Sequence, residues 1–376
     1  MILAVTPNPA LDLTWHVDRL VPGETHRVES GATRAGGKGV NVARVLHEQG
    51  VEVLALTTAG GSAGAELAAD LVASDIPQRL VPVAGTTRRS VAIVDTDAAQ
   101  TAVLNEHGSP LTSDEAAALD AAVLEAAASA AASAAAPARA AAAGDRDLDV
   151  AVISGSLPPG YAPERLGALV TGLNRAGLRV IVDTSGPGLL EAARAGAYAL
   201  KPNGEELTAA TRLVDPIAGA RLLLDLGATL VVVSLGGDGL MLVSRAEGGR
   251  PVRARLPRVL RGNATGAGDA AVAAIAAALA EPIALDADTP QATDARRRLA
   301  RRAVAWSASA VLVPLAGSLS PEHDALEREV VVDPAPPVAE ETADRTADRA
   351  DTRTDDTQHP ENTEHADRPE YPEDPA

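Results

Sequence analysis

Four short apolar segments, each ending in a polar residue, constrain the fold of this chain more than any other feature. They occupy residues 150–154, 180–183, 197–201 and 230–234, and segments compatible with helices, such as 163–177 and 217–227, separate them. Continuous apolar runs of this length are typical of parallel strands buried on both faces. The sequence therefore predicts an α/β fold with a doubly wound parallel sheet.

The polar residues that end these segments are Ser154, Asp183, Lys201 and Ser234. In sheets of this kind, ligands bind beyond the carboxyl ends of the strands. We therefore expect these four side chains to border one crevice.

The N-terminal third shows a different strand pattern. Apolar residues at 11, 13, 15 and 17 alternate with polar residues at 12, 14, 16 and 18, and a period of two indicates a strand with one apolar and one polar face. Segments 89–94 and 101–104 can pair with this strand. We predict a small sheet, within about 10–34 and 88–106, that forms a lid over the crevice.

Two segments of biased composition lie outside these patterns. Residues 333–376 contain eight Asp and six Glu against four Arg, and thus carry −10 of the formal net charge of −18. With so few apolar residues, this segment is predicted to be a disordered acidic tail after a domain at 1–332. Residues 116–143 are rich in Ala, which favours helix, and are predicted to form a helical insertion at the surface.

The overall composition excludes several classes of protein. The chain has no Cys, which excludes disulfides, thiolate metal sites and a cysteine nucleophile. The acidic charge argues against nucleic-acid and membrane partners, and no segment resembles an export signal or a membrane span, so we expect a cytoplasmic protein. Because 46% of the residues are hydrophobic but only 1% aromatic, the core must consist mainly of Ala, Val, Leu and Ile.

The segment 262–269, Gly-Asn-Ala-Thr-Gly-Ala-Gly-Asp, runs into an apolar helical stretch at 270–280. Gly266, Ala267 and Gly268 are predicted to present backbone amides at a helix N-terminus, where they stabilise a transferring anionic group. Asp269 in the first turn is placed to accept a proton from an attacking hydroxyl. An Asp at this position is also a common helix cap.

The same segment fits a dinucleotide-binding pattern, G-x-G-x-x-A, with Asp286 as a ribose ligand. We favour this oxidoreductase alternative less because residues 260–263 do not form a buried strand. In addition, Asp269 would repel a pyrophosphate.

A second glycine-rich segment, 36–39, precedes residues with helical spacing. Gly37 and Lys38 can bind an anion at the start of that helix, and Asn41 faces the same way as Lys38. The spacing of a phosphate-binding Walker A loop is absent.

Three residues of the lid segments are candidates for a sugar phosphate. Arg88 offers a guanidinium suited to two-point contact with phosphate. Asp12 and Asn105 can bind sugar hydroxyls or cap a turn.

Two further motifs follow strand ends and suit a nucleotide. The turn after 230–234 contains Gly236, Gly237 and Gly239, which leave room for a nucleoside against the backbone. Lys201 is followed by Asn203 and Glu206, which are spaced to order water on Mg²⁺ or to cap a helix.

Together, in this order, these motifs resemble the ribokinase-like carbohydrate kinases, the phosphofructokinase B family, and most closely its 1-phosphofructokinase and tagatose-6-phosphate kinase branch. The opening segment 6–12, Thr-Pro-Asn-Pro-Ala-Leu-Asp, and Leu-Asn-Glu at 104–106 are features of that branch. Segments 36–41 and 265–269 resemble the two family signatures. The resemblance extends over approximately residues 1–332.

The resemblance implies a three-layer αβα fold with a small β-sheet lid, and an enzyme that uses ATP with Mg²⁺. It implies that Asp269 is the catalytic base and that Gly266, Ala267 and Gly268 form the anion hole. The implied sugar-phosphate residues are Asp12, Gly37, Lys38, Asn41, Arg88 and Asn105. The implied ATP residues are Lys201, Asn203, Ser234, Gly236, Gly237, Gly239 and Thr265, with Glu206 acting on Mg²⁺ through water, together with Asn203.

By the same resemblance, the favoured reaction is phosphorylation of fructose 1-phosphate to fructose 1,6-bisphosphate. His107 stands where the branch often shows Pro, and Ser90 where some members carry Asn, so tagatose 6-phosphate or another hexose is an alternative acceptor. A non-catalytic sugar or nucleotide sensor is a further alternative. A homodimer formed through the lid is an alternative to a monomer.

Overall fold

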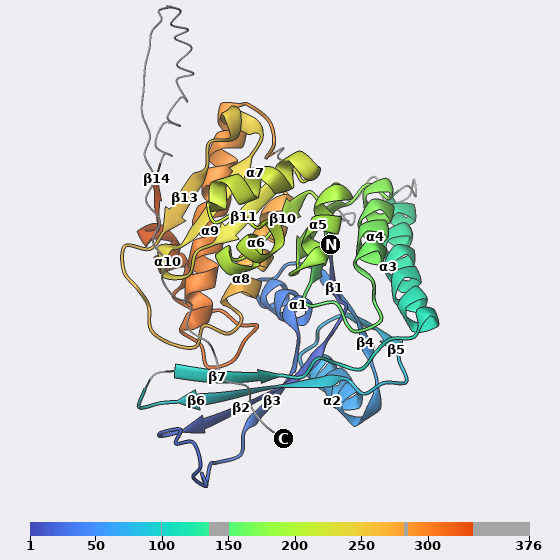
Figure 1. Ribbon diagram of the computed structural model, residues 1–376, viewed down its shortest axis with the longest axis vertical. Helices are drawn as coiled ribbons and strands as arrows, with labels where there is room; N and C mark the ends of the chain where they lie inside the picture. The colour runs from blue at the N-terminus through green and yellow to red at the C-terminus, as the bar shows by residue number, and fades with distance from the viewer. Residues whose placement is uncertain (99, 135–149, 282–284, 334–376) are drawn as a thin grey trace, which may run out of the picture. The chain divides into compact units, whose positions relative to one another are not determined.

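The computed structural model of the protein describes residues 1–98, 100–134, 150–281 and 285–333 (Figure 1). Within these ranges the strands form two sheets. The central sheet has ten strands in the order β14-β13-β12-β11-β10-β9-β8-β1-β4-β5, and the second has four in the order β3-β2-β6-β7. Residues 334–376 and 135–143, which belong to the predicted tail and the predicted insertion, lie outside the described residues.

The central sheet confirms the predicted mostly parallel fold. Its strands are β1 (Ile2–Thr6), β4 (Val53–Ala59), β5 (Gln78–Pro82), β8 (Val150–Ser154), β9 (Arg179–Asp183), β10 (Ala199–Leu200), β11 (Leu230–Ser234), β12 (Leu240–Ser244), β13 (Val252–Arg255) and β14 (Val331–Asp333). All neighbours from β11 to β5 pair in parallel, whereas β12, β13 and β14 add antiparallel pairs at one edge. The four apolar segments noted in the sequence are β8, β9, β10 and β11.

Helices cover both faces of the sheet, as in a three-layer fold (Figure 1). One face packs against α1 (Lys38–Glu48), α2 (Gly61–Ala73), α8 (Ala267–Leu279) and α9 (Pro290–Val311), with α10 (His323–Glu329) behind. The other packs against α3 (Ser113–Ala134), α4 (Pro163–Arg175), α5 (Pro187–Arg194), α6 (Gly204–Thr211) and α7 (Pro216–Leu226). No helix in the described ranges is long and apolar enough to cross a membrane.

Small aliphatic side chains fill the core, as the composition predicted. Helix α8 buries Ala270, Ala271, Ala273 and Ala274 together with Val272. Such small side chains let α8 lie close to α1 and α9 at native packing density, and this close packing fixes the start of α8.

Two predicted boundaries change in the structure. Asp333 was placed in the tail, but it pairs with Arg253 as the last residue of β14, so the folded part extends beyond residue 332. The described part of the predicted insertion belongs to α3, which begins at Ser113 rather than 116 and is not confined to the surface, because Leu119 and Val123 are fully buried. An apolar stripe, not Ala content alone, holds this helix on the sheet.

The second sheet is the predicted lid. It consists of β2 (Ala10–Val17), β3 (Ala32–Gly36), β6 (Arg88–Asp95) and β7 (Gln100–Asn105). Strand β2 pairs in parallel with β6, and Asp12 of β2 lies opposite Ser90, which lies opposite Asn105 of β7. The polar residues of the period-two pattern therefore share one face of the lid.

Candidate active site

A cavity of about 830 Å³ lies where the lid meets the carboxyl ends of the central strands. We call it the crevice. Asp183, Lys201 and Ser234 line it as expected, and Ser154 lies beneath, donating its hydroxyl to Asp183 Oδ2 at 3.0 Å. Three of the four strand-end residues therefore border the crevice as predicted, whereas Ser154 is fully buried and contacts it only through Asp183.

Asp269 lies buried in the first turn of α8, facing the crevice. Its Oδ2 accepts a hydrogen bond of 2.8 Å from Asn41 Nδ2. Burial, opposed by Lys38, raises the pKa of Asp269 from 3.8 to about 6. A carboxyl with this pKa is ionised at neutral pH yet close enough to it to act as a general base.

The backbone amides at the start of α8 belong to Asp269 and the three residues before it. Gly266 caps α8 with a positive φ of 85°, and a Cβ there would lie 2.9 Å from that of Ala316. Among the described residues, the amides of Gly266, Gly268 and Asp269 donate no hydrogen bond within the protein, whereas that of Ala267 donates to Ala264 O at 3.2 Å. The free donors are thus two of the three expected amides, with Asp269 in place of Ala267.

Two lysines flank the fully buried Asp183. Lys38 Nζ lies 3.4 Å and Lys201 Nζ 3.3 Å from Asp183 Oδ1. Although burial alone would raise it, the pKa of Asp183 is held below its usual value by these lysines. Lys38 is also 3.5 Å from Glu206 Oε1. Lys38 was expected among the sugar-phosphate residues, but here it is already paired with two carboxylates.

Asn203 and Glu206 form the helix cap that the sequence left as the alternative. Asn203 Oδ1 accepts from the amide of Glu206 at 2.7 Å, and Glu206 Oε2 accepts from the amide of Asn203 at 2.9 Å. This capping box at α6 leaves Glu206 Oε1 facing the crevice beside Lys38.

The donor set can be tested for Mg²⁺. No group of three or more Asp, Glu, His or Cys side chains in the described ranges could hold a metal ion directly. Mg²⁺ usually keeps several waters and binds one or two carboxylates plus substrate phosphates. Glu206 fits that mode through Oε1, which faces the crevice and is paired with Lys38, whereas Asn203 Oδ1 already accepts the hydrogen bond of the cap.

The lid contributes the predicted sugar-side residues. Asp12, Arg88 and Asn105 line the crevice. Burial and the charge of Asp269 raise the pKa of Asp12 to about 7, against the opposing effect of Arg88. Gly36 makes room for this carboxylate, because a Cβ there would lie 2.0 Å from Asp12 Oδ2.

Arg88 is anchored but keeps donors free. Its Nε and Nη1 donate to the carbonyls of Asn8 and Glu106, both at 3.3 Å. Gly37 also lines the crevice, with a φ of 96° that favours glycine. No described residue accepts a hydrogen bond from Arg88 Nη2, so this group can donate to a phosphate.

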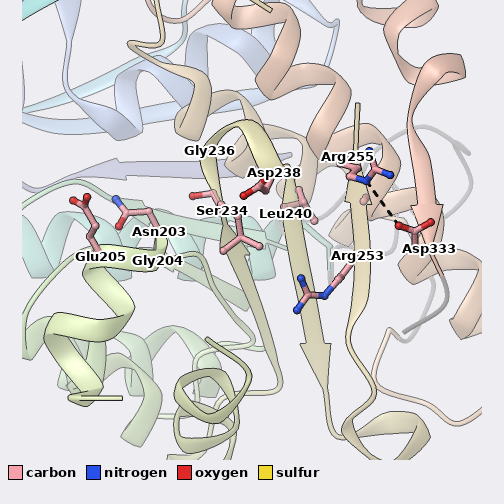
Figure 2. A pocket seen from close by; sticks show the side chains of 12 residues that line it. Asn203, Gly204, Glu205, Ser234, Gly236, Asp238, Leu240, Arg253, Arg255 and Asp333 are labelled. Atoms are coloured by element: carbon pink, nitrogen blue, oxygen red, sulfur yellow. Dashed lines mark ion pairs between the residues drawn. The ribbon is translucent and has the colours of Figure 1, made fainter. Parts of the chain in front are cut away.

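A second cavity of about 850 Å³ adjoins the turn after β11 and shares Asn203 and Ser234 with the crevice (Figure 2). Gly236 lines this second cavity, and Gly237 and Gly239 belong to the same turn. Position 239 requires glycine, because its φ is 84° and a Cβ there would lie 2.1 Å from Ala254 O of the neighbouring strand. Thr265 lies on the crevice side instead.

Sequence reasoning missed two features of the site. It placed Asp183 at the crevice but gave it no partner, and only the fold brings Lys38 and Lys201 to it. It also assigned no role to Ser156, which lines the crevice and accepts from Asn8 Nδ2 at 3.0 Å. The Pro-Asn-Pro at 7–9 is the one local signal for this contact.

The dinucleotide alternative does not hold. No strand leads directly into α8, because β13 ends at Arg255 and residues 256–266 form loop and turns. Asp286 instead accepts from the hydroxyl of Tyr198 at 3.3 Å, so it is engaged away from the Gly266–Asp269 amides.

Comparisons with known proteins show which family this chain is similar to. Residues 6–323 match the pfkB family of carbohydrate kinases. The chain is 36% identical over 294 residues to a 1-phosphofructokinase of Xanthomonas campestris, covering 74% of this chain and 83% of that one. It is also 36% identical over 285 residues to the ATP-dependent 6-phosphofructokinase isozyme 2 of Mycobacterium tuberculosis, covering 74% and 77%.

Solved structures show the same fold. Phosphofructokinase-2 from Escherichia coli in complex with fructose-6-phosphate superposes with a TM-score of 0.70 at 28% identity, covering 87% of this chain and 97% of that one. Ribokinase from Arabidopsis thaliana has a TM-score of 0.59 at 20% identity, covering 87% and 97%, and supports the fold alone. This chain therefore belongs to the pfkB family of carbohydrate kinases and is an ATP-dependent carbohydrate kinase.

Proposed function

We propose that this kinase transfers the γ-phosphoryl group of ATP to the 6-hydroxyl of fructose 1-phosphate, giving fructose 1,6-bisphosphate. The observation that carries the proposal is the buried carboxylate of Asp269 beside the free amides of Gly266 and Gly268, in a crevice that the lid closes with Arg88. The Xanthomonas relative is named 1-phosphofructokinase, which supports this choice of acceptor.

Asp269 takes the proton of the acceptor hydroxyl as that oxygen attacks phosphorus. With Oδ2 bound to Asn41, the base is Oδ1. The amides at 266, 268 and 269 stabilise charge on the transferring group, and Lys201 lies next to Gly268, with its Nζ 3.5 Å from the position of a Cβ there.

The nucleotide's phosphates lie between Lys201 and these amides, with Thr265 beside them, and the nucleoside lies along the turn from Ser234 to Gly239. Mg²⁺, when bound, neutralises phosphate charge. Glu206 would hold it through water by Oε1, which faces the crevice beside Lys38.

Fructose 6-phosphate is a second candidate acceptor, favoured by the Mycobacterium relative at the same identity. Both acceptors give the same bisphosphate, so identifying the product does not separate them. The decisive experiment compares kcat/KM for fructose 1-phosphate, fructose 6-phosphate, tagatose 6-phosphate and free hexoses with ATP and Mg²⁺. Fructose 1-phosphate should lead by at least tenfold, and a higher value for any other acceptor would replace the proposal.

Arg88 is proposed to hold the phosphate already on the sugar. Loss of a hydrogen bond to a charged group is worth about 1.5 to 3 kcal/mol, so Arg88→Ala should raise the KM for fructose 1-phosphate about 10- to 150-fold and leave the KM for ATP unchanged. Arg89→Ala is the matched control, because Arg89 is the next residue on β6 and points to the other face of the lid. Equal effects on both substrates, or a similar effect of the control, would contradict this role.

The outer face of the lid supports the proposed homodimer. Leu13 and Trp15 of β2 and Val91 and Ile93 of β6 remain half-exposed there, and such apolar sheet faces favour a partner. Sedimentation of the full chain should give the mass of two copies, whereas Leu13→Lys should give one.

A further inference from the structure

We propose that Asn41 is a positioning residue that binds Oδ2 of Asp269 and thereby presents Oδ1 to the acceptor hydroxyl. This inference rests on the proposed role of Asp269 as base. The family resemblance placed Asn41 among the sugar-phosphate residues, but in the structure its amide nitrogen faces the carboxylate at 2.8 Å, with both residues buried.

The direction of the Asn41 amide is dictated by its neighbours. An ionised carboxylate only accepts hydrogen bonds, so Nδ2 must face Asp269. Asn41 Oδ1 then points away and has no hydrogen-bond partner. It lies against Gly317, where a Cβ would be 3.2 Å from it. Asn41 lines the crevice, but this oxygen is buried and the Nδ2 of the same amide is bound to Asp269.

The position of Asn41 on α1 makes the contact rigid. Helix α1 packs on α8, and Asn41 lies in its first turn, three residues after Lys38. Buried side chains in packed helices have few rotamers to exchange. The carboxylate plane of Asp269 is thus set from α1, while its peptide amide remains at the start of α8.

Other charges act on Asp269 from several elements. Lys38 on α1 and Lys201 after β10 lower the pKa of Asp269, whereas Asp183 on β9 raises it. The charge of Asp269 in turn raises the pKa of Asp12 on β2. Helix α9 also packs on α8. Its Arg302 pairs with Glu281, which lies just after the C-terminal end of α8 and so far from Asp269 along that helix. The bond from Asn41 is the one hydrogen bond that a described side chain donates to Asp269, and it also lowers the pKa.

Removing this bond should therefore move a measurable pH limb. The activity of wild type should rise with pH through about 6, the pKa of Asp269. A hydrogen bond to a charged group is worth a shift of about 1 to 2 pH units. Asn41→Leu should move the acid limb of kcat/KM to about pH 7 or 8, and Asn41→Asp should move it at least as far, because a second carboxylate opposes ionisation.

The control for loss of a structural amide is Asn174→Leu. Asn174 on α4 donates to the carbonyls of Ala195 and Gly196 at 3.0 Å, away from the crevice. This variant should lower the melting temperature without moving the limb. Asn41→Asp preserves size, so it keeps the test valid if the leucine variant does not fold.

The outcomes separate this inference from the proposed function. If both Asn41 variants keep the acid limb near pH 6 while kcat falls, Asn41 has only a structural role. If they instead raise the KM for the sugar phosphate alone, Asn41 is a sugar ligand and the inference is wrong. If Asp269→Asn retains wild-type turnover, the base assignment itself fails, whatever the Asn41 variants do.

Discussion

Replacement of Asp269 by Asn should stabilise the protein while abolishing its activity. Burial raises the pKa of Asp269 from 3.8 to about 6, so the folded state binds this proton more tightly than the unfolded chain. Stability is therefore lost as pH rises from about 4 to 6, and the cost persists above that window. At about 1.36 kcal/mol per pH unit, the full cost is about 3 kcal/mol.

The neutral amide of Asn removes that cost only where Asp269 would be ionised. The difference in the free energy of unfolding, variant minus wild type, should thus grow by about 2 to 3 kcal/mol between pH 4 and pH 8. Asp12 adds in the same direction, because the charge of Asp269 raises the pKa of Asp12 in the wild type. Any constant change in hydrogen bonding with Asn41 cancels from this pH dependence.

Urea unfolding at several pH values from 4 to 8 measures the difference, with equal m-values required for the comparison. Asp225→Asn, at an exposed position on α7, is the matched control and should show no such trend. Turnover of Asp269→Asn should fall by about 10²- to 10⁴-fold. A stability difference that is flat with pH, or that falls toward pH 8, would refute the electrostatic reasoning.

Two further predictions concern the charges around the phosphoryl group. Asp183→Asn leaves the buried ammonium of Lys201 without its partner and should cost about 3 to 5 kcal/mol of unfolding free energy at pH 7. Because the pKa of Asp183 in the folded state is lowered, this loss should shrink below about pH 4. A cost under about 1 kcal/mol at pH 7 would contradict the pairing. Glu206→Gln keeps the capping box but removes the carboxylate charge beside Lys38, so the Mg²⁺ concentration for half-maximal activity should rise about tenfold. An unchanged Mg²⁺ requirement would exclude Glu206.

The fold was predictable because short apolar runs in the sequence mark its buried strands. Each of the segments ending at Ser154, Asp183 and Ser234 is apolar over its whole length, which only a strand buried on both faces requires. The edge formed by β12 to β14 was not predicted, because antiparallel pairing at an edge depends on partners distant in sequence. The short β14 is such a case, since Asp333 opens a segment whose composition resembles a disordered tail.

The members of the site were predictable, but their pairing was not. Glycine-rich turns ahead of helices mark amide donors from sequence alone, and Gly266 and Gly268 occupy such a turn. Which amide is free depends on a local bond, here from Ala267 to Ala264 O. Asn41 shows the same limit: helical spacing predicts that it faces the crevice side, whereas its contact with Asp269 arises from the packing of α1 on α8.

The fold changes the expectation that Lys38 and Arg88 both offer their charge to an anionic substrate. Lys38 is shared between Asp183 and Glu206, so its charge is largely balanced before any substrate binds. Two doubly anionic substrates therefore need neutralisation from groups that carry no counter-ion of their own. In the described crevice these are the amides at the start of α8, the guanidinium of Arg88 and a metal ion brought with the nucleotide. Protonation of Asp12, whose pKa is about 7, removes one repelling charge, so binding of the sugar phosphate should tighten as pH falls from 8 to 6, even as turnover by Asp269 declines.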